Sequence, residues 1–133
     1  MIVLDTHALL WWVNADGRLS AAAQEAIEAE RAAEDGRLLV SAITAWEIAM
    51  LVQRGRLVLS MDVDDWLATV VSIEGVYFVP VTNAVAVQSV RLPGDFHPDP
   101  ADRIITALAR HHAVPVVTAD RKIQDYPHVK TIW

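Results

Sequence analysis

Residues 2–7 of the chain have the sequence IVLDTH. Ile2, Val3 and Leu4 are apolar and two of them are β-branched, which is typical of a short buried strand. Asp5 follows directly, at a place where removing an ionised carboxylate from water is costly. The stretch therefore predicts a buried strand that ends in an acid, and that acid needs partners.

The rest of the chain alternates short apolar runs with longer helical patterns. Besides the first strand at 3–4, strands are predicted at 38–40, 77–79 and 115–117, with an edge strand at 131–132. Helices are predicted at 20–34, 44–54, 62–72, 83–91 and 100–112. Such alternation indicates right-handed crossovers and a mainly parallel sheet covered by helices on both faces. We expect one three-layer α/β/α domain over residues 1–133.

The composition excludes several classes of protein. A chain of 133 residues with 53% hydrophobic and 21% charged residues is a folded globular domain. It has no cysteine, which rules out disulfides, thiolate zinc sites and cysteine nucleophiles. No apolar run approaches the roughly 20 residues of a membrane span, and no basic region precedes the first apolar run. We expect a cytoplasmic protein without a membrane anchor.

The net charge of −6 bears on nucleic-acid binding. A module that binds by neutralising phosphates is usually basic, so the charge counts against a simple DNA- or RNA-binding domain. It counts less against a metal-dependent nuclease, because clustered carboxylates are negative until cations bind.

Four acids from distant segments are expected at one edge of the sheet. Ligand sites of open α/β sheets lie at the carboxyl ends of the strands, where the following helices begin. Asp5 and Asp120 follow strands, Glu47 lies in the first turns after the second strand, and Asp102 begins a helix. This convergence carries more weight than any one motif.

Each acid other than Asp5 also has a local explanation. Thr44 and Glu47 fit a capping box, in which Glu47 would bind only a backbone N–H. Asp99 before Pro100 fits a helix N-cap, which makes Asp102 the third helical residue. Asp120 could cap a short helix at 121–124.

Together, however, the acids could not all stay ionised without a partner. Two carboxylates about 4 Å apart repel each other by roughly 4 kcal/mol at an effective dielectric constant near 20. Either some of them hold protons, or a cation lies among them. Oxygen ligands suit hard ions, so Mg²⁺ or Mn²⁺ is the candidate cofactor.

Four segments resemble the motif regions of the PIN-domain family in order and spacing: IVLDTHALLWW, VSAITAWEIAMLVQRGRL, DPADRIITALA and VPVVTADRKI. They are most similar to the VapC-type toxins of bacterial type II toxin–antitoxin pairs. The resemblance implies a Rossmann-like α/β/α sandwich and an Mg²⁺- or Mn²⁺-dependent ribonuclease. It also implies a cognate VapB-type antitoxin and a homodimer.

The resemblance places the catalytic, metal-binding acids at Asp5, Glu47, Asp102 and Asp120. Hydrolysis of an RNA phosphodiester by metal-activated water is the expected reaction. We expect Asp5 and Asp102 as direct ligands, then Asp120, while Glu47 ligates through water or orients the attacking one. The remaining predicted site residues are Thr6 and Thr118, which would support the ligands, and Arg103 and Arg121, which could contact RNA phosphates.

Three alternatives remain from the residues themselves. His7 and His97 could form an acid–base pair that uses the RNA 2′-hydroxyl. A phosphatase with Asp5 as nucleophile lacks its second Asp, because His7 stands there. The acids could also bind Mg²⁺ without turnover in a receiver-like or interaction domain.

Tryptophans on two predicted helices are candidates for core or interface. The segment WEIAMLVQ is apolar nearly all round, which usually means burial. We therefore expect Trp46 in the core, and Trp11 or Trp12 at a dimer or antitoxin surface.

Overall fold

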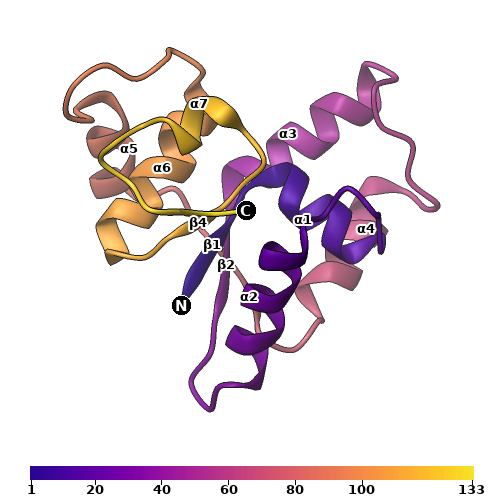
Figure 1. Cartoon of the computed structure of the whole chain (residues 1–133). Helices are drawn as coiled ribbons and strands as arrows, with labels where there is room; N and C mark the ends of the chain where they lie inside the picture. The colour runs from indigo at the N-terminus through magenta and orange to yellow at the C-terminus, as the bar shows by residue number, and fades with distance from the viewer.

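The computed structural model describes residues 1–133 and has three layers, with a parallel sheet between two groups of helices (Figure 1). The strands are β1 (Ile2–Leu4), β2 (Leu38–Ser41), β3 (Val76–Val79), β4 (Val116–Val117) and β5 (Thr131–Ile132). The helices are α1 (Thr6–Val13), α2 (Ala21–Ala32), α3 (Ala42–Gln53), α4 (Val63–Val71), α5 (Asn83–Val90), α6 (Pro100–His112) and α7 (Arg121–Gln124). The predicted fold class, including the edge strand at 131–132, is confirmed.

The strand order is β3-β2-β1-β4-β5, and every pair is parallel. The chain starts in the middle of the sheet, builds outward to β3, and then crosses back to add β4 on the other side of β1. The register pairs Val3 with Val116 and Leu4 with Val117. The order of the strands therefore reverses between β1 and β4, which is where open α/β sheets form their functional crevice.

The two faces of the sheet bury separate apolar cores. Alternate residues of a strand point to opposite faces, so Leu4 and Val40 pack with α1, α2 and α4, whereas Val3 and Leu39 pack with α5 and α6. Figure 1 shows α1, α2 and α4 on one side of the strands and α5, α6 and α7 on the other. Burial on both faces explains why the strands are continuous apolar runs.

Helix α3 begins earlier than predicted. Its N-cap is Ser41, the last residue of β2, whose Oγ accepts a hydrogen bond from the Ile43 N–H at 3.2 Å. The capping box of Thr44 and Glu47, the local alternative considered from the sequence, is therefore not formed, since Thr44 lies inside the first turn. The strand passes into the helix without a loop.

The predicted core position of Trp46 is also wrong, whereas an interface role for Trp11 or Trp12 stays a prediction. Trp46 on α3 is 57% exposed, while Trp11 and Trp12 on α1 are partly buried against the core. Only Thr44 and Ile48 of α3 are fully buried, and Trp46 is the one large apolar side chain of this helix that is exposed. None of the helices has the length and apolar composition that a membrane crossing requires.

Candidate active site

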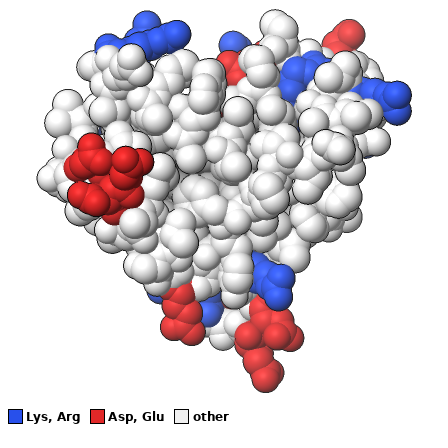
Figure 2. All heavy atoms as spheres, turned by 180° about the vertical axis from the view of Figure 1, so that it is seen from behind, with Lys and Arg blue, Asp and Glu red and all other residues white.

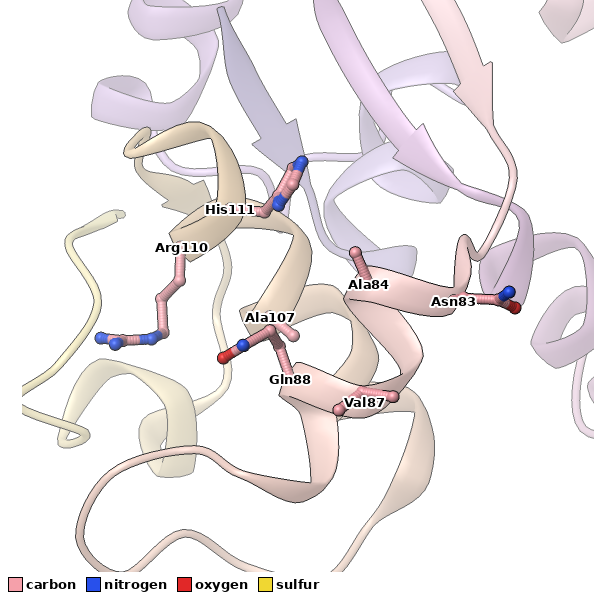
Figure 3. Close-up of a pocket in the computed structure, with 7 residues that line it drawn as sticks. All are labelled: Asn83, Ala84, Val87, Gln88, Ala107, Arg110 and His111. Atoms are coloured by element: carbon pink, nitrogen blue, oxygen red, sulfur yellow. The ribbon is translucent and has the colours of Figure 1, made fainter.

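Two pockets are candidates for the functional site. The larger, about 510 Å³, lies between α5 and α6 and is lined by Asn83, Ala84, Val87, Gln88, Ala107, Arg110 and His111 (Figure 3). It has no carboxylate and only Arg110 and His111 as ionisable groups. Its chemistry offers neither a cation site nor an acid–base pair of carboxylates.

The second pocket, about 370 Å³, lies at the carboxyl ends of the central strands and is acidic. It is lined by Asp5, His7, Trp11, Glu47, Asp99, Asp102, Ala119 and Asp120. All four acids predicted from the sequence contribute to it, and Asp99 adds a fifth. The structure thus brings together residues up to 115 positions apart in the chain, from Asp5 to Asp120.

Asp5 lies at the bottom of this pocket and is only 5% exposed. One carboxylate oxygen accepts from the Thr6 N–H at 2.8 Å, and the other accepts from the Thr118 hydroxyl at 2.7 Å. Burial raises the pKa of the Asp5 carboxyl, although these hydrogen bonds act in the opposite direction. Thr118 follows β4, the strand that pairs with β1, so the register of the two strands fixes this contact.

Glu47 reaches the pocket from the second turn of α3. Its Oε1 accepts a hydrogen bond from the Thr6 hydroxyl at 2.6 Å, and that hydroxyl lies 3.0 Å from the Thr44 hydroxyl. Thr6 and Thr44 are buried, so Glu47 is held by a hydroxyl pair beneath the pocket. Burial raises the pKa of Glu47, and the negative charge of Asp5 adds to this effect.

Asp99 and Asp102 stand at the N-terminus of α6. The Asp99 carboxylate caps the helix by accepting from the Asp102 N–H at 3.0 Å, and Pro100 occupies the first turn as predicted. Burial, followed by the charges of Asp5, Asp99, Asp120 and Glu47, raises the pKa of Asp102 to about 8. The negative charges of the other acids in the pocket therefore act most strongly on Asp102.

Asp120 has both of the roles that the sequence suggested for it, because it caps a helix and also lines the acidic pocket. Its Oδ1 caps α7 by accepting from the Lys122 N–H at 2.9 Å, and the side chain also lines the acidic pocket. Its own N–H donates to the Thr118 hydroxyl at 3.0 Å. Thr118 thus connects Asp120 to Asp5 through one buried oxygen.

The donor set suits a hard divalent cation. Carboxylate oxygens dominate the pocket, and no Lys or Arg lines it to neutralise them. Raised pKa values at Asp5, Glu47 and Asp102 mean that the protein alone stabilises these charges poorly. A bound cation would reverse that balance, because it favours the ionised carboxylates.

His97 belongs to the same cluster, although sequence reasoning placed it only in an alternative scheme with His7. Its Nε2 lies 3.2 Å from Asp102 Oδ2, and ligand atoms of His97, Asp102 and Asp120 all lie within 4.8 Å of one another. The segment that carries His97 contains Pro93, Gly94 and Pro98, so periodicity could not predict its path. Proximity in sequence to Asp99 was the only available signal.

The two arginines predicted to contact RNA differ in their surroundings. The Arg103 guanidinium donates to the backbone carbonyls of Ser89 at 2.8 Å and Phe96 at 2.9 Å, with a further bond to His97. These bonds favour a structural role for Arg103 over the predicted RNA contact. Arg121 is exposed at the start of α7, beside Asp120, and its RNA contact stays a prediction.

A family model and a related protein both match nearly the whole chain. A model of the PIN domain matches residues 2–129. The chain is 38% identical over 135 residues to Ribonuclease VapC22 of Mycobacterium tuberculosis, covering 99% of this chain and 98% of that protein.

Solved structures share the fold at lower sequence identity. A toxin–antitoxin complex from Klebsiella pneumoniae has a TM-score of 0.64 at 20% identity, covering 97% of this chain and 95% of that one. VapBC2 from Rickettsia felis, bound to a promoter DNA fragment, has a TM-score of 0.66 at 14% identity over 98% and 97%. VapC20 of M. tuberculosis, described as a toxin that cleaves the sarcin–ricin loop, has a TM-score of 0.64 at 17% identity over 98% and 99%.

Proposed function

This chain belongs to the PIN-domain family, and we propose that it is a metal-dependent endoribonuclease that serves as the toxin of a VapBC-type toxin–antitoxin pair. The observation that carries the proposal is the convergence of Asp5, Glu47, Asp102 and Asp120 on one pocket in a chain that resembles a named ribonuclease along its whole length. The proposed substrate is RNA, and its hydrolysis would inhibit translation and growth.

We assign the cation to Asp5, Asp102 and Asp120. Bound Mg²⁺ or Mn²⁺ would supply Lewis acidity toward the phosphate and neutralise charge on the departing oxygen. Thr118 holds the Asp5 carboxylate in one orientation, and the cap of α6 fixes the backbone from which Asp102 projects. The hydrogen bonds from Thr6 and Thr118 hold the Asp5 carboxylate in place before substrate arrives.

Glu47 has a different task. It is fixed by Thr6 but is less buried than Asp5, and its pKa is raised. We assign to Glu47 the orientation of the attacking water and the acceptance of its proton, because Thr6 fixes its carboxylate and it is more accessible than that of Asp5. The water then attacks phosphorus, the bond from phosphorus to the 3′-oxygen breaks, and the departing 3′-oxygen takes a proton from solvent. The RNA 2′-hydroxyl takes no part.

The test is RNA cleavage by the purified chain with and without divalent cation. Cleavage should require Mg²⁺ or Mn²⁺, and Asp5→Asn should lower its rate by at least about a hundredfold with the fold retained. Asp65→Asn, an exposed acid on α4, is the matched control and should cleave like the wild type.

The ends of the products separate the mechanisms. Attack by water leaves 5′-phosphate and 3′-hydroxyl ends, and a 2′-deoxy substitution at the cut site should still permit cleavage. Full activity in excess chelator, or a 2′,3′-cyclic phosphate detected by mass spectrometry, would contradict the metal-dependent mechanism. Either result would favour the mechanism in which His7 and His97 act as the acid–base pair.

An antitoxin partner would cover part of the apolar surface. Exposed Trp46, together with Ala49 and Met50, lines a groove on α3 that ends at Arg54. Related structures are described as toxin–antitoxin complexes, and we propose that an apolar segment of a VapB-type antitoxin lies along this helix. We further propose that the protein acts in the cytoplasm, where it would inhibit translation.

Expression in bacteria tests this partner. The chain alone should arrest growth, and co-expression of the antitoxin encoded beside it should restore growth. A chain that is harmless alone and binds Mg²⁺ without cutting RNA would favour the non-catalytic alternative.

We also propose a homodimer. Figure 2 shows a face on which Lys, Arg, Asp and Glu lie around the margin and the centre carries none of them. Large apolar side chains are also exposed on α4, on the edge strand β3 and on α5, namely Val71, Tyr77, Val87 and Val90. A second copy of the chain would bury surface of this kind.

A further inference from the structure

His97 presents a buried nitrogen that has no hydrogen-bond partner. Its Nε2 is enclosed by the protein, and although Asp102 Oδ2 lies 3.2 Å away, the pair does not form a hydrogen bond. A buried polar atom without a partner is unfavourable, and native structures keep few of them.

The segment that carries His97 is firmly held in place. Arg103 donates to the carbonyls of Phe96 and His97 and to those of Ser89 and Val90 at the end of α5. The Phe96 ring packs edge-on against Tyr126, with ring centroids 4.6 Å apart, and the Tyr126 hydroxyl donates to the Pro93 carbonyl. The position of the His97 ring is therefore fixed by tertiary contacts.

We propose that His97 is a ligand of the cation, and that its Nε2 binds the same ion as Asp102 and Asp120. The inference rests on the proposed metal-dependent function. Adjacent ligands of an octahedral ion with bonds of about 2.1 Å lie about 3.0 Å apart, and opposite ligands about 4.2 Å apart. The 3.2 Å separation of His97 and Asp102 matches adjacent ligands, and all three ligand atoms lie within 4.8 Å of one another, which is near the distance between opposite ligands.

A nitrogen ligand changes which ion the site prefers. Carboxylates alone suit Mg²⁺ and Mn²⁺ alike, whereas imidazole favours transition metals over Mg²⁺. With His97 as a ligand, the site should bind Mn²⁺ more tightly than Mg²⁺. Arg103 is then a positioning residue, because it holds the backbone of the segment that delivers the imidazole.

Pulsed electron paramagnetic resonance of Mn²⁺ bound to the full chain tests the ligand directly. The wild type should show ¹⁴N coupling of a directly bound imidazole. His97→Gln should lose this coupling and weaken Mn²⁺ binding by at least about tenfold, while Mg²⁺ binding changes less. His111→Ala, in the pocket between α5 and α6, is the matched control and should keep both the coupling and the affinity.

The outcomes separate this inference from the proposed function. Mn²⁺ bound without ¹⁴N coupling, or coupling that is lost in His7→Ala and kept in His97→Gln, would overturn the ligand role of His97 and leave the metal-dependent nuclease intact. A wild type that binds neither Mn²⁺ nor Mg²⁺ would overturn both. Circular dichroism of each variant shows whether the fold is retained.

Discussion

Asp99 and Asp102 lie one turn apart at the start of α6, yet they have different surroundings. Asp99 is exposed and its carboxylate caps the helix, whereas Asp102 is partly buried among Asp5, Glu47 and Asp120. Burial and neighbouring charge make an acid useful as a cation ligand, whereas capping requires only a short oxygen acceptor.

The two residues should therefore respond differently to the same substitution. Asp99→Asn should retain most of the activity, because Asn caps a helix about as well as Asp. Asp102→Asn should lower cleavage by at least about a hundredfold, because it removes a negative ligand. The measurement is the single-turnover cleavage rate of each variant at saturating Mn²⁺; equal losses would mean that Asp99 also binds the ion.

At this scale the sequence predicted the acids but not everything that holds them. Asp5 and Asp120 follow strands and Asp102 starts a helix, so local patterns were sufficient to place them at one edge. The contact of the Thr6 hydroxyl with Thr44 joins α1 to α3, and the position of His97 depends on carbonyl bonds from Arg103. Such contacts join distant segments and leave no periodic pattern in the sequence.

Among the elements, α3 shows the limit of hydrophobic patterning most clearly. Its sequence is apolar nearly all round, and the pattern could not show that Ile48 is buried while Trp46 is 57% exposed. Helix α6, by contrast, has one apolar face, so its buried side could be predicted. The early start of α3 was missed because Ser41 is both the end of a strand and the cap of a helix.

Substitutions on α3 should distinguish its two faces. Ile48→Ala should lower the free energy of unfolding by about 2–5 kcal/mol, because it leaves a cavity in the core. Trp46→Ala should lower it by less than about 1 kcal/mol. Urea unfolding of both variants checks this. A cost at Trp46 as large as that at Ile48, varying with protein concentration, would show that a second copy of the chain covers α3.

In the molecule as a whole, the carboxyl groups whose negative charge is least favourable lie together at the point where the strand order reverses. The pKa of Asp102 is raised to about 8, and burial also raises those of Asp5 and Glu47. Since the folded state then holds protons that the unfolded chain releases, folding should become less favourable as pH rises between about 4 and 8. A bound cation needs the ionised carboxylates, so it should stabilise the fold more at high pH.

Thermal unfolding across this pH range tests the linkage. Without divalent cation, the Tm should fall as pH rises from about 5 to about 8, and added Mn²⁺ should raise it more at the upper end. In Asp102→Asn the fall should be smaller, because the most strongly perturbed carboxyl is gone. If Mn²⁺ raised the Tm by the same amount at the low and the high end of this pH range, cation binding would not depend on ionisation of these carboxyl groups.

The reversal of strand order also determines when during synthesis the protein can become active. Asp5 is made well before its partner Thr118 and the neighbouring Asp120, which come 113 and 115 positions later. Until β4 has been synthesised and has paired with β1, every nascent chain lacks part of the acidic pocket. A nascent chain that has been synthesised only as far as the end of α6 therefore cannot cut RNA, and this ability depends on the later synthesis of β4 and Asp120.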